Sequence, residues 1–162
     1  MMNISKLKWI KNVKHQDNHQ YWAYLPETMQ IVEAKIFCLN WRDIKQKSNA
    51  QKPSKGDLMI LLQRAKVTHI VEFLDDEVYD NSLDEWSIYR VVKAVWMPSK
   101  GIMWDDDRLH QKEFFGLDYI VGDGHAHSLA DNNKMPQFHE YWNQYGGLSG
   151  FQNHVLEKIT KI

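Results

Sequence analysis

The sequence is poor in the residues and runs that define several classes of protein. It has one cysteine, Cys38, which excludes an internal disulfide, a CxxC redox pair and a cysteine-rich zinc motif. No apolar run approaches the length of a membrane span, and four lysines interrupt the first 14 residues, unlike a signal peptide. Motifs of P-loop, dinucleotide-binding and serine-hydrolase proteins are also missing. We therefore expect a cytoplasmic protein without a bound cofactor.

Net charge is small and aromatic content is high. The net charge of −1 excludes binding of a polyanion through overall charge, so a nucleic-acid site would need a local basic patch. The chain of 162 residues contains 7 Trp, 7 Tyr and 6 Phe. In a single domain of this length, large aromatic side chains fill the core. Some of them also suit a pocket for a flat ligand, because aromatic faces stack on bases.

The order of the predicted elements indicates an α+β fold. Residues 1–20 are polar and basic, and we expect a solvated arm ahead of a single domain over residues 21–162. Apolar and β-branched runs predict strands at residues 21–27, 31–41, 56–63, 67–74 and 86–98. Helices are predicted at residues 108–115, 136–147 and 148–162, the last with Phe151, Val155, Leu156 and Ile159 on one stripe. The prediction is a small, curved, mainly antiparallel sheet or pseudo-barrel with flanking helices.

Charge is concentrated in two neighbouring segments of opposite sign. Residues 42–66 hold seven Lys or Arg against two Asp, and residues 72–85 hold seven Asp or Glu and no basic residue. Two solvated loops that keep the protein soluble would give this pattern. A bipolar surface would also give it, with a basic lip that attracts phosphates and an acidic lip that repels them. On the second interpretation, Lys55, Arg64 and Lys66 are the predicted phosphate contacts.

Several short motifs resemble a known family. They are Gly56-Asp57 before an apolar strand, Ile70-Val71 in the next strand, Trp86 before a third strand, and the aromatic segment of residues 21–27. Over about residues 21–98 this pattern resembles the PUA-like superfamily and, within it, EVE domains. Glu72 stands where that family has glycine, and neither residues 1–20 nor the chain after Pro98 has a counterpart in it.

The resemblance implies a pseudo-barrel with a cleft for a nucleobase of DNA or RNA, often a modified base. The residues that it implies are Trp22 and Trp41 as walls, Asn40 as a reader of the base edge, and Arg42 as a contact to an edge or a phosphate. A base outside its stack needs these parts: a stacking face, edge donors and cations for the flanking phosphates. Packing in the core is the alternative role for each tryptophan.

An enzymatic interpretation is kept as an alternative, although no catalytic residue is assigned and binding is the main prediction. ASCH domains, a related branch of the superfamily that contains small hydrolases, call for Lys, Thr and Glu in the cleft. Lys66, Thr68 and Glu72 alternate along one predicted strand, which is compatible with general acid–base chemistry. The same alternation is typical of the solvent face of a half-buried strand.

A metal site is the other enzymatic alternative. Asp123, His125 and His127 are residue types that hard or borderline cations accept. A His-x-His pair without a fixed third ligand is a common coincidence, however. We therefore predict no metal site, and keep a metal-dependent hydrolase only as an alternative to base binding.

Overall fold

The computed structural model describes residues 2–18, 20–80, 85–131 and 133–162. In these residues the strands are β1 (Leu7–Asn12), β2 (Ile36–Trp41), β3 (Leu58–Gln63), β4 (Lys66–Phe73), β5 (Tyr79–Asp80), β6 (Ile88–Trp96) and β7 (His127–Ser128). The α-helices are α1 (Lys47–Ala50), α2 (Gln111–Phe115), α3 (Pro136–Asn143) and α4 (Gly147–Ile159). Short 3-10 helices occupy Ile4–Lys6, Pro26–Thr28, Ile44–Gln46 and Asp107–Leu109. The α+β class is confirmed, and none of the described helices is long and apolar enough to cross a membrane.

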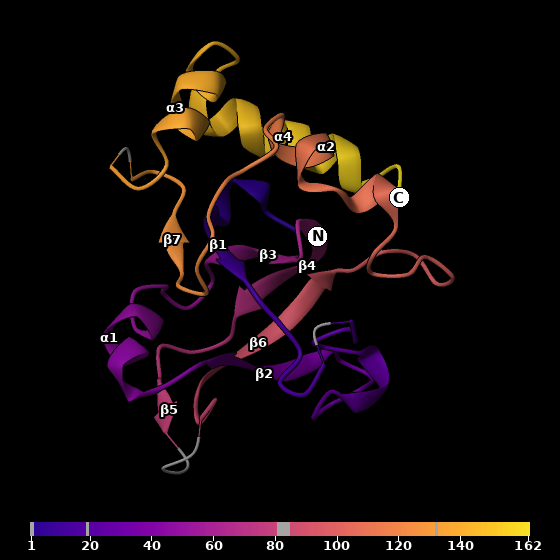
Figure 1. Ribbon diagram of the computed structural model, residues 1–162, viewed down its shortest axis with the longest axis vertical. Coiled ribbons are helices and arrows are strands. Elements are labelled where there is room, and N and C mark those ends of the chain that lie inside the picture. The colour runs from indigo at the N-terminus through magenta and orange to yellow at the C-terminus, as the bar shows by residue number, and fades with distance from the viewer. Residues whose placement is uncertain (1, 19, 81–84, 132) are drawn as a thin grey trace.

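The strands form one open and mostly antiparallel sheet. Their order is β2-β6-β4-β3-β1-β7, and β5 pairs with β6 beside this path. Only the pairing of β1 with β3 is parallel among the described strands. Helices α2, α3 and α4 gather on one side of the sheet (Figure 1). The expectation of a mainly antiparallel sheet with flanking helices is therefore confirmed.

Strand β3 lies between two apolar clusters. All six of its residues are buried, and alternate side chains point to opposite faces of a strand. Leu58, Ile60 and Leu62 pack with the apolar side chains of α2, α3 and α4. Met59 and Leu61 pack in the second cluster, on the opposite face, together with Ala50 of α1. Burial on both faces explains why this strand is a continuous apolar run in the sequence.

The predicted arm is wrong, because part of residues 1–20 is a strand inside the sheet. Strand β1 pairs with β3 on one side and β7 on the other, and Leu7 and Ile10 are fully buried. In the sequence, lysines separate the few apolar residues of this segment, so the strand pattern is weak. One of these lysines, Lys11, is only 2% exposed. The basic residues that predict a solvated arm therefore include one that is buried in the protein.

The predicted strand at residues 21–27 is also wrong. Its backbone bonds to side chains instead of a neighbouring strand. The Ala23 N–H donates to Gln63 Oε1 over 2.9 Å, and Gln63 Nε2 donates to the Tyr21 carbonyl over 2.5 Å. His69 Nε2 donates to the Tyr24 carbonyl over 3.0 Å, and Pro26 then begins a 3-10 helix. The segment is thus a loop held against the sheet by two buried polar side chains.

The other expected elements are present with changed bounds. Strands β3, β4 and β6 agree with the prediction to within two residues at each end. Strand β2 begins five residues later than expected, because Ile31 and Ile36 pair across a turn in which Lys35 has φ 56°. Gly56 lies in the turn before β3 with φ 88°, a backbone conformation that glycine adopts readily. In α4 the predicted stripe is buried except for Leu156, which is 37% exposed.

Arg90 on β6 is buried and joins the end of α1 and the segment after it to the loop after β4. Its Nη1 donates to the carbonyls of Ala50 and Pro53 over 2.8 and 2.7 Å, and its Nη2 donates to the Asp75 carbonyl over 2.6 Å. The guanidinium carbon lies 4.6 Å from the ring centroid of Phe73. Arg90 therefore fixes the end of α1, and Asn49 of the same helix bonds Trp41 at the end of β2.

Candidate functional site

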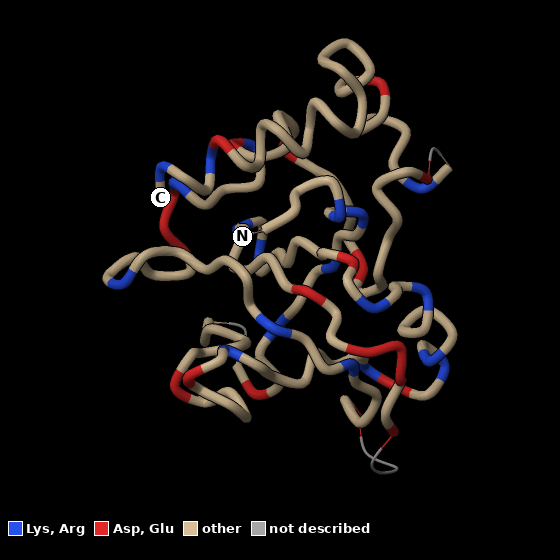
Figure 2. Tube along the Cα trace, turned by 180° about the vertical axis from the view of Figure 1, so that it is seen from behind, with Lys and Arg blue, Asp and Glu red and all other residues tan. Residues whose placement is uncertain are grey.

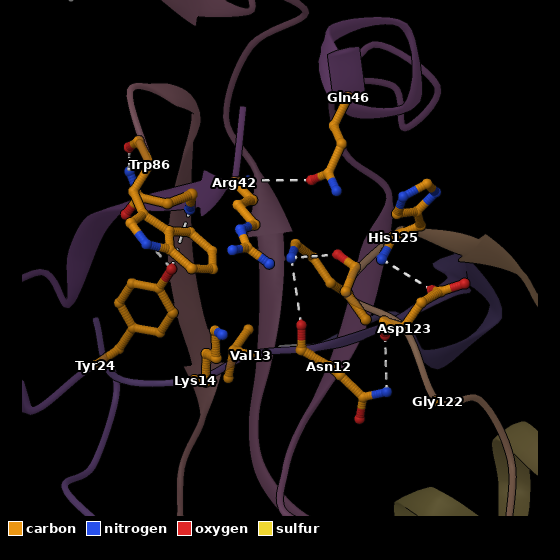
Figure 3. Close-up of a pocket in the computed structure, with 13 residues that line it drawn as sticks. Asn12, Val13, Lys14, Tyr24, Arg42, Gln46, Trp86, Gly122, Asp123 and His125 are labelled. Atoms are coloured by element: carbon orange, nitrogen blue, oxygen red, sulfur yellow. Dashed lines mark hydrogen bonds between the residues drawn. The ribbon is translucent and has the colours of Figure 1, made fainter. Parts of the chain in front are cut away.

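A cavity of about 380 Å³ opens between the end of β1 and the end of β2. Its lining residues are Lys11, Asn12, Val13, Lys14, Tyr24, Asn40, Arg42, Gln46, Trp86, Gly122, Asp123, Gly124 and His125. Figure 3 shows Trp86 and Tyr24 on one side, Asp123 and His125 on the other, and the Arg42 side chain between them. We call this cavity the cleft.

Asn49 on α1 brings the two sides of the cleft together. Its Oδ1 accepts hydrogen bonds from Trp41 Nε1 over 2.8 Å and from the Ala126 N–H over 2.7 Å, and its Nδ2 donates to the Ala126 carbonyl over 2.9 Å. Trp41 ends β2, and Ala126 precedes β7. One amide therefore links two edge strands that lie at opposite ends of the sheet order, and the sheet must curve for this contact to form.

Trp86 forms one wall of the cleft and has a strained backbone. Its φ is 69°, in the left-handed region that a bulky residue rarely adopts. Two hydrogen bonds hold it there: its N–H donates to the Arg42 carbonyl over 2.6 Å, and its carbonyl accepts from Asn40 Nδ2 over 2.7 Å. Lys14 Nζ lies 5.5 Å from the centroid of the indole. Backbone strain of this kind persists where the surroundings enforce it, and it clusters at functional sites.

Tyr24 forms the second aromatic surface of the cleft and is held from several sides. Its hydroxyl accepts from the Asn40 N–H over 3.0 Å, and its ring lies 4.5 Å from the ring of Phe37 between centroids. Burial raises the pKa of Tyr24 above its usual value, so the phenol stays protonated. Burial also lowers the pKa of His69 to about 4, so the imidazole that anchors the Tyr24 carbonyl is neutral at pH 7.

Lys11 brings a buried amine to the cleft. Its Nζ donates to the carbonyls of Gly124 and Asn12 over 2.6 and 3.3 Å, and it lies 5.0 Å from the centroid of the Trp41 ring. Burial lowers the pKa of Lys11 from 10.5 to about 7, and the nearby Asp123 carboxylate opposes this change. The amine therefore exchanges between its charged and neutral forms close to neutral pH.

The exposed part of the cleft carries both signs of charge. Arg42 Nε lies 2.6 Å from Glu85 Oε1, with the two side chains 57% and 54% exposed. Asp123 Oδ1 accepts from His127 Nε2 over 2.6 Å and from the His125 N–H over 3.0 Å. Burial would raise the pKa of Asp123, but these hydrogen bonds hold it below its usual value. Basic side chains are nonetheless in excess among the lining residues.

Two of the four predicted base-binding residues line the cleft. Asn40 and Arg42 do so, and their roles in base binding stay predictions. Trp41 is 0% exposed and packs in the apolar core, so it offers no face to a ligand. Trp22 lines a separate, mostly apolar cavity beside Leu25 and residues 97–103. The alternative role in packing is therefore the correct one for Trp41.

The predicted phosphate contacts do not line the cleft. Lys55 is exposed, and its N–H donates to Asp76 Oδ1 over 2.6 Å. Arg64 and Lys66 line another cavity, where Lys66 Nζ lies 3.6 Å from a carboxylate oxygen of Asp107. The basic and acidic segments are in contact with each other and do not form opposite lips, and Figure 2 shows basic and acidic positions interspersed along the trace.

The enzymatic alternatives find no assembled site in the described part of the chain. Lys66 and Glu72 line different cavities, and Thr68 is fully buried, with its hydroxyl 2.8 Å from His69 Nδ1. Within residues 2–18, 20–80, 85–131 and 133–162, no group of three or more His, Cys, Asp or Glu is arranged to hold a metal ion. Asp123 and His127 form a hydrogen-bonded pair.

The residues that sequence reasoning missed are Lys11, Lys14, Tyr24 and Trp86. The sequence indicates Trp86 only as a position of the resembled family and Tyr24 only as part of an aromatic segment. No protein-family model matches the chain, and no curated protein is significantly similar to it. The function is therefore inferred from the chemistry of the cleft.

Proposed function

We propose that this chain binds DNA or RNA and holds one nucleobase, plain or modified, in the cleft. The observation that carries the proposal is Trp86, whose indole lines the cavity while two hydrogen bonds keep its backbone in a strained conformation. An extruded base lies flat on an aromatic ring, and such stacking contributes about 1–3 kcal/mol per base. Tyr24 supplies a second aromatic surface beside it.

Asn40 is the reader of the base edge. Its side chain bonds the Trp86 carbonyl through Nδ2 over 2.7 Å, and the Tyr24 hydroxyl lies 3.5 Å from its Oδ1. An amide has two N–H donors and two acceptor lone pairs. These contacts fix the orientation of the amide and leave one N–H group and one lone pair for the edge of a base.

Lys14 and Arg42 are the contacts to the flanking phosphates. Both side chains are exposed and line the cleft, so they can follow a strand whose base has entered it. Each phosphate contact of this kind adds about one unit to the slope of log affinity against log salt. The cleft thus combines a stacking face, an edge reader and local cations in a chain whose net charge is −1.

Titration of single-stranded and mismatched oligonucleotides, plain and methylated, at two salt concentrations tests the proposal. Trp86→Leu is expected to weaken binding by about fivefold to a hundredfold through lost stacking, and Trp86→Phe to retain most of the affinity. Tyr145→Leu removes an exposed tyrosine between α3 and α4, and it serves as the matched control. Binding that is absent, or equally strong in Trp86→Leu, rejects the proposal.

Glu85→Gln is expected to tighten oligonucleotide binding by a few-fold at low salt. Glu85 holds Arg42 over 2.6 Å and places a negative charge where a phosphate would lie. An exposed pair of this kind contributes under about 1 kcal/mol to folding, so stability should hardly change. Fluorescence anisotropy at low and high salt measures the effect, with Glu157→Gln on α4 as the control. Weaker binding by Glu85→Gln would show that Arg42 is not a phosphate contact.

A further inference from the structure

We propose that the cleft takes a ligand whose buried end carries an anionic oxygen group, a carboxylate on the ring or a phosphate, and that Lys11 binds this group. The inference deepens the proposed function and rests on it. The cleft would then select acidic bases or nucleotides over uncharged bases.

Lys11 has the contacts of a cation but no carboxylate bound to it among the described residues. Two carbonyls accept from Nζ, those of Gly124 at 2.6 Å and Asn12 at 3.3 Å, and the Trp41 ring lies 5.0 Å from it. Lys11 is 2% exposed. A buried charge without an ionic partner is costly, and buried charges are usually paired or bound to an ion. An ammonium has three N–H groups, so one is left to meet a ligand.

The charged neighbours of Lys11 favour an incoming anion. Asp123 faces it from the loop before β7, but Oδ1 of that carboxylate is bonded to His127 and to the His125 N–H. The side chains of Lys14 and Arg42 line the same cavity. Glu85 is paired with Arg42 at its exposed side. An anion beside Lys11 would therefore gain a buried charge partner together with a surplus of positive charge.

The same cavity holds Trp86 and Asn40, so the ligand must also be flat and present polar edges. A pyrimidine that carries a carboxylate satisfies both demands within one molecule. A nucleoside monophosphate also satisfies both demands, but its anionic group is a phosphate that the sugar separates from the base. Orotate, uracil, uridine monophosphate and inorganic phosphate therefore distinguish the two sources of the anion.

Isothermal titration calorimetry with these four probes tests the proposal. At about pH 6.5 the wild-type protein should bind orotate or uridine monophosphate at least about tenfold tighter than uracil, the size expected for one charge-assisted hydrogen bond. Lys11→Met should remove this preference. Lys161→Met removes an exposed lysine that follows α4, outside the cleft, and should leave the preference in place.

Proton uptake provides a second readout. Because burial places the pKa of Lys11 at about 7 in the free protein, an anion bound at about pH 8 should draw part of a proton onto the amine, about 0.4 for a tenfold preference for the charged form. Titrations in two buffers of different ionisation enthalpy measure it. The uptake should vanish in Lys11→Met and persist in His125→Gln.

Equal affinity for orotate, uridine monophosphate and uracil would overturn the inference, and so would a preference that survives in Lys11→Met. Neither result bears on the oligonucleotide experiment with Trp86→Leu. The proposal of base binding and the proposal of an anion at Lys11 can therefore be rejected independently. A preference for inorganic phosphate alone, without any contribution from the ring, would also overturn it, because the cleft would then be an anion site and not a base site.

Discussion

Arg90→Met is expected to lower the free energy of unfolding by about 3 kcal/mol, because it leaves buried carbonyls without their donor. Arg90 is fully buried and donates to the carbonyls of Ala50, Pro53 and Asp75. Methionine restores most of the packing on Phe73 but none of these hydrogen bonds. Chemical denaturation at neutral pH measures the change.

The matched control for Arg90 is Arg108→Met. Arg108 is exposed and pairs with Asp106 over 2.9 Å, so its loss should change stability by less than about 0.5 kcal/mol. Arg90→Met should also weaken oligonucleotide binding, because the loops it joins support α1, whose Asn49 links the two sides of the cleft. A loss of stability below about 1 kcal/mol for Arg90→Met would contradict this role.

Lys11→Met is expected to stabilise the protein near and below neutral pH, and the gain should shrink as the pH rises. Burial lowers the pKa of Lys11 from 10.5 to about 7 in the folded state. Between these two values the unfolded chain binds more protons than the folded one, so wild-type stability rises with pH across this window. The methionine variant lacks this titration.

The difference in unfolding free energy between Lys11→Met and wild type should therefore fall by about 3 kcal/mol between about pH 6 and about pH 9.5. Subtracting the unfolding free energy of wild type from that of the variant removes the contributions of other groups that titrate in the same range. Lys14→Met, in which an exposed lysine is replaced, should show a difference that hardly depends on pH. A flat difference for Lys11→Met would mean that the amine is not desolvated in the folded protein.

The sequence predicts those parts of the fold in which local pattern and tertiary environment agree. Strands β3, β4 and β6 are apolar or alternating runs, and they lie at the centre of the sheet. The prediction fails where distant side chains decide the structure. Residues 21–23 form a loop because Gln63, about forty positions away, satisfies their backbone. Strand β1 is not predicted, because a lysine indicates an exposed segment, whereas Lys11 is buried in the fold.

The sequence predicts the candidate site in part, and the alternation of side chains along a strand argues against Trp41 as a wall of the site. Asn40 and Arg42 are two apart on or beside β2, and both line the cleft. Because alternate side chains of a strand point to opposite faces, Trp41 between them packs on the other face, in the apolar core. Lys11, Tyr24 and Trp86 come from segments that meet only when the sheet curves, and no local pattern in the sequence brings them together.

Photo-crosslinking tests the central claim most directly. An oligonucleotide that carries 5-iodouracil at one position forms a covalent bond to an aromatic ring on which that base lies, and mass spectrometry of the digested protein identifies the ring. We predict a crosslink to Trp86 or Tyr24 that is competed by unlabelled oligonucleotide and lost when Trp86 is replaced by leucine. Crosslinks confined to exposed aromatic residues outside the cleft, such as Tyr119 and Tyr145, would contradict the account.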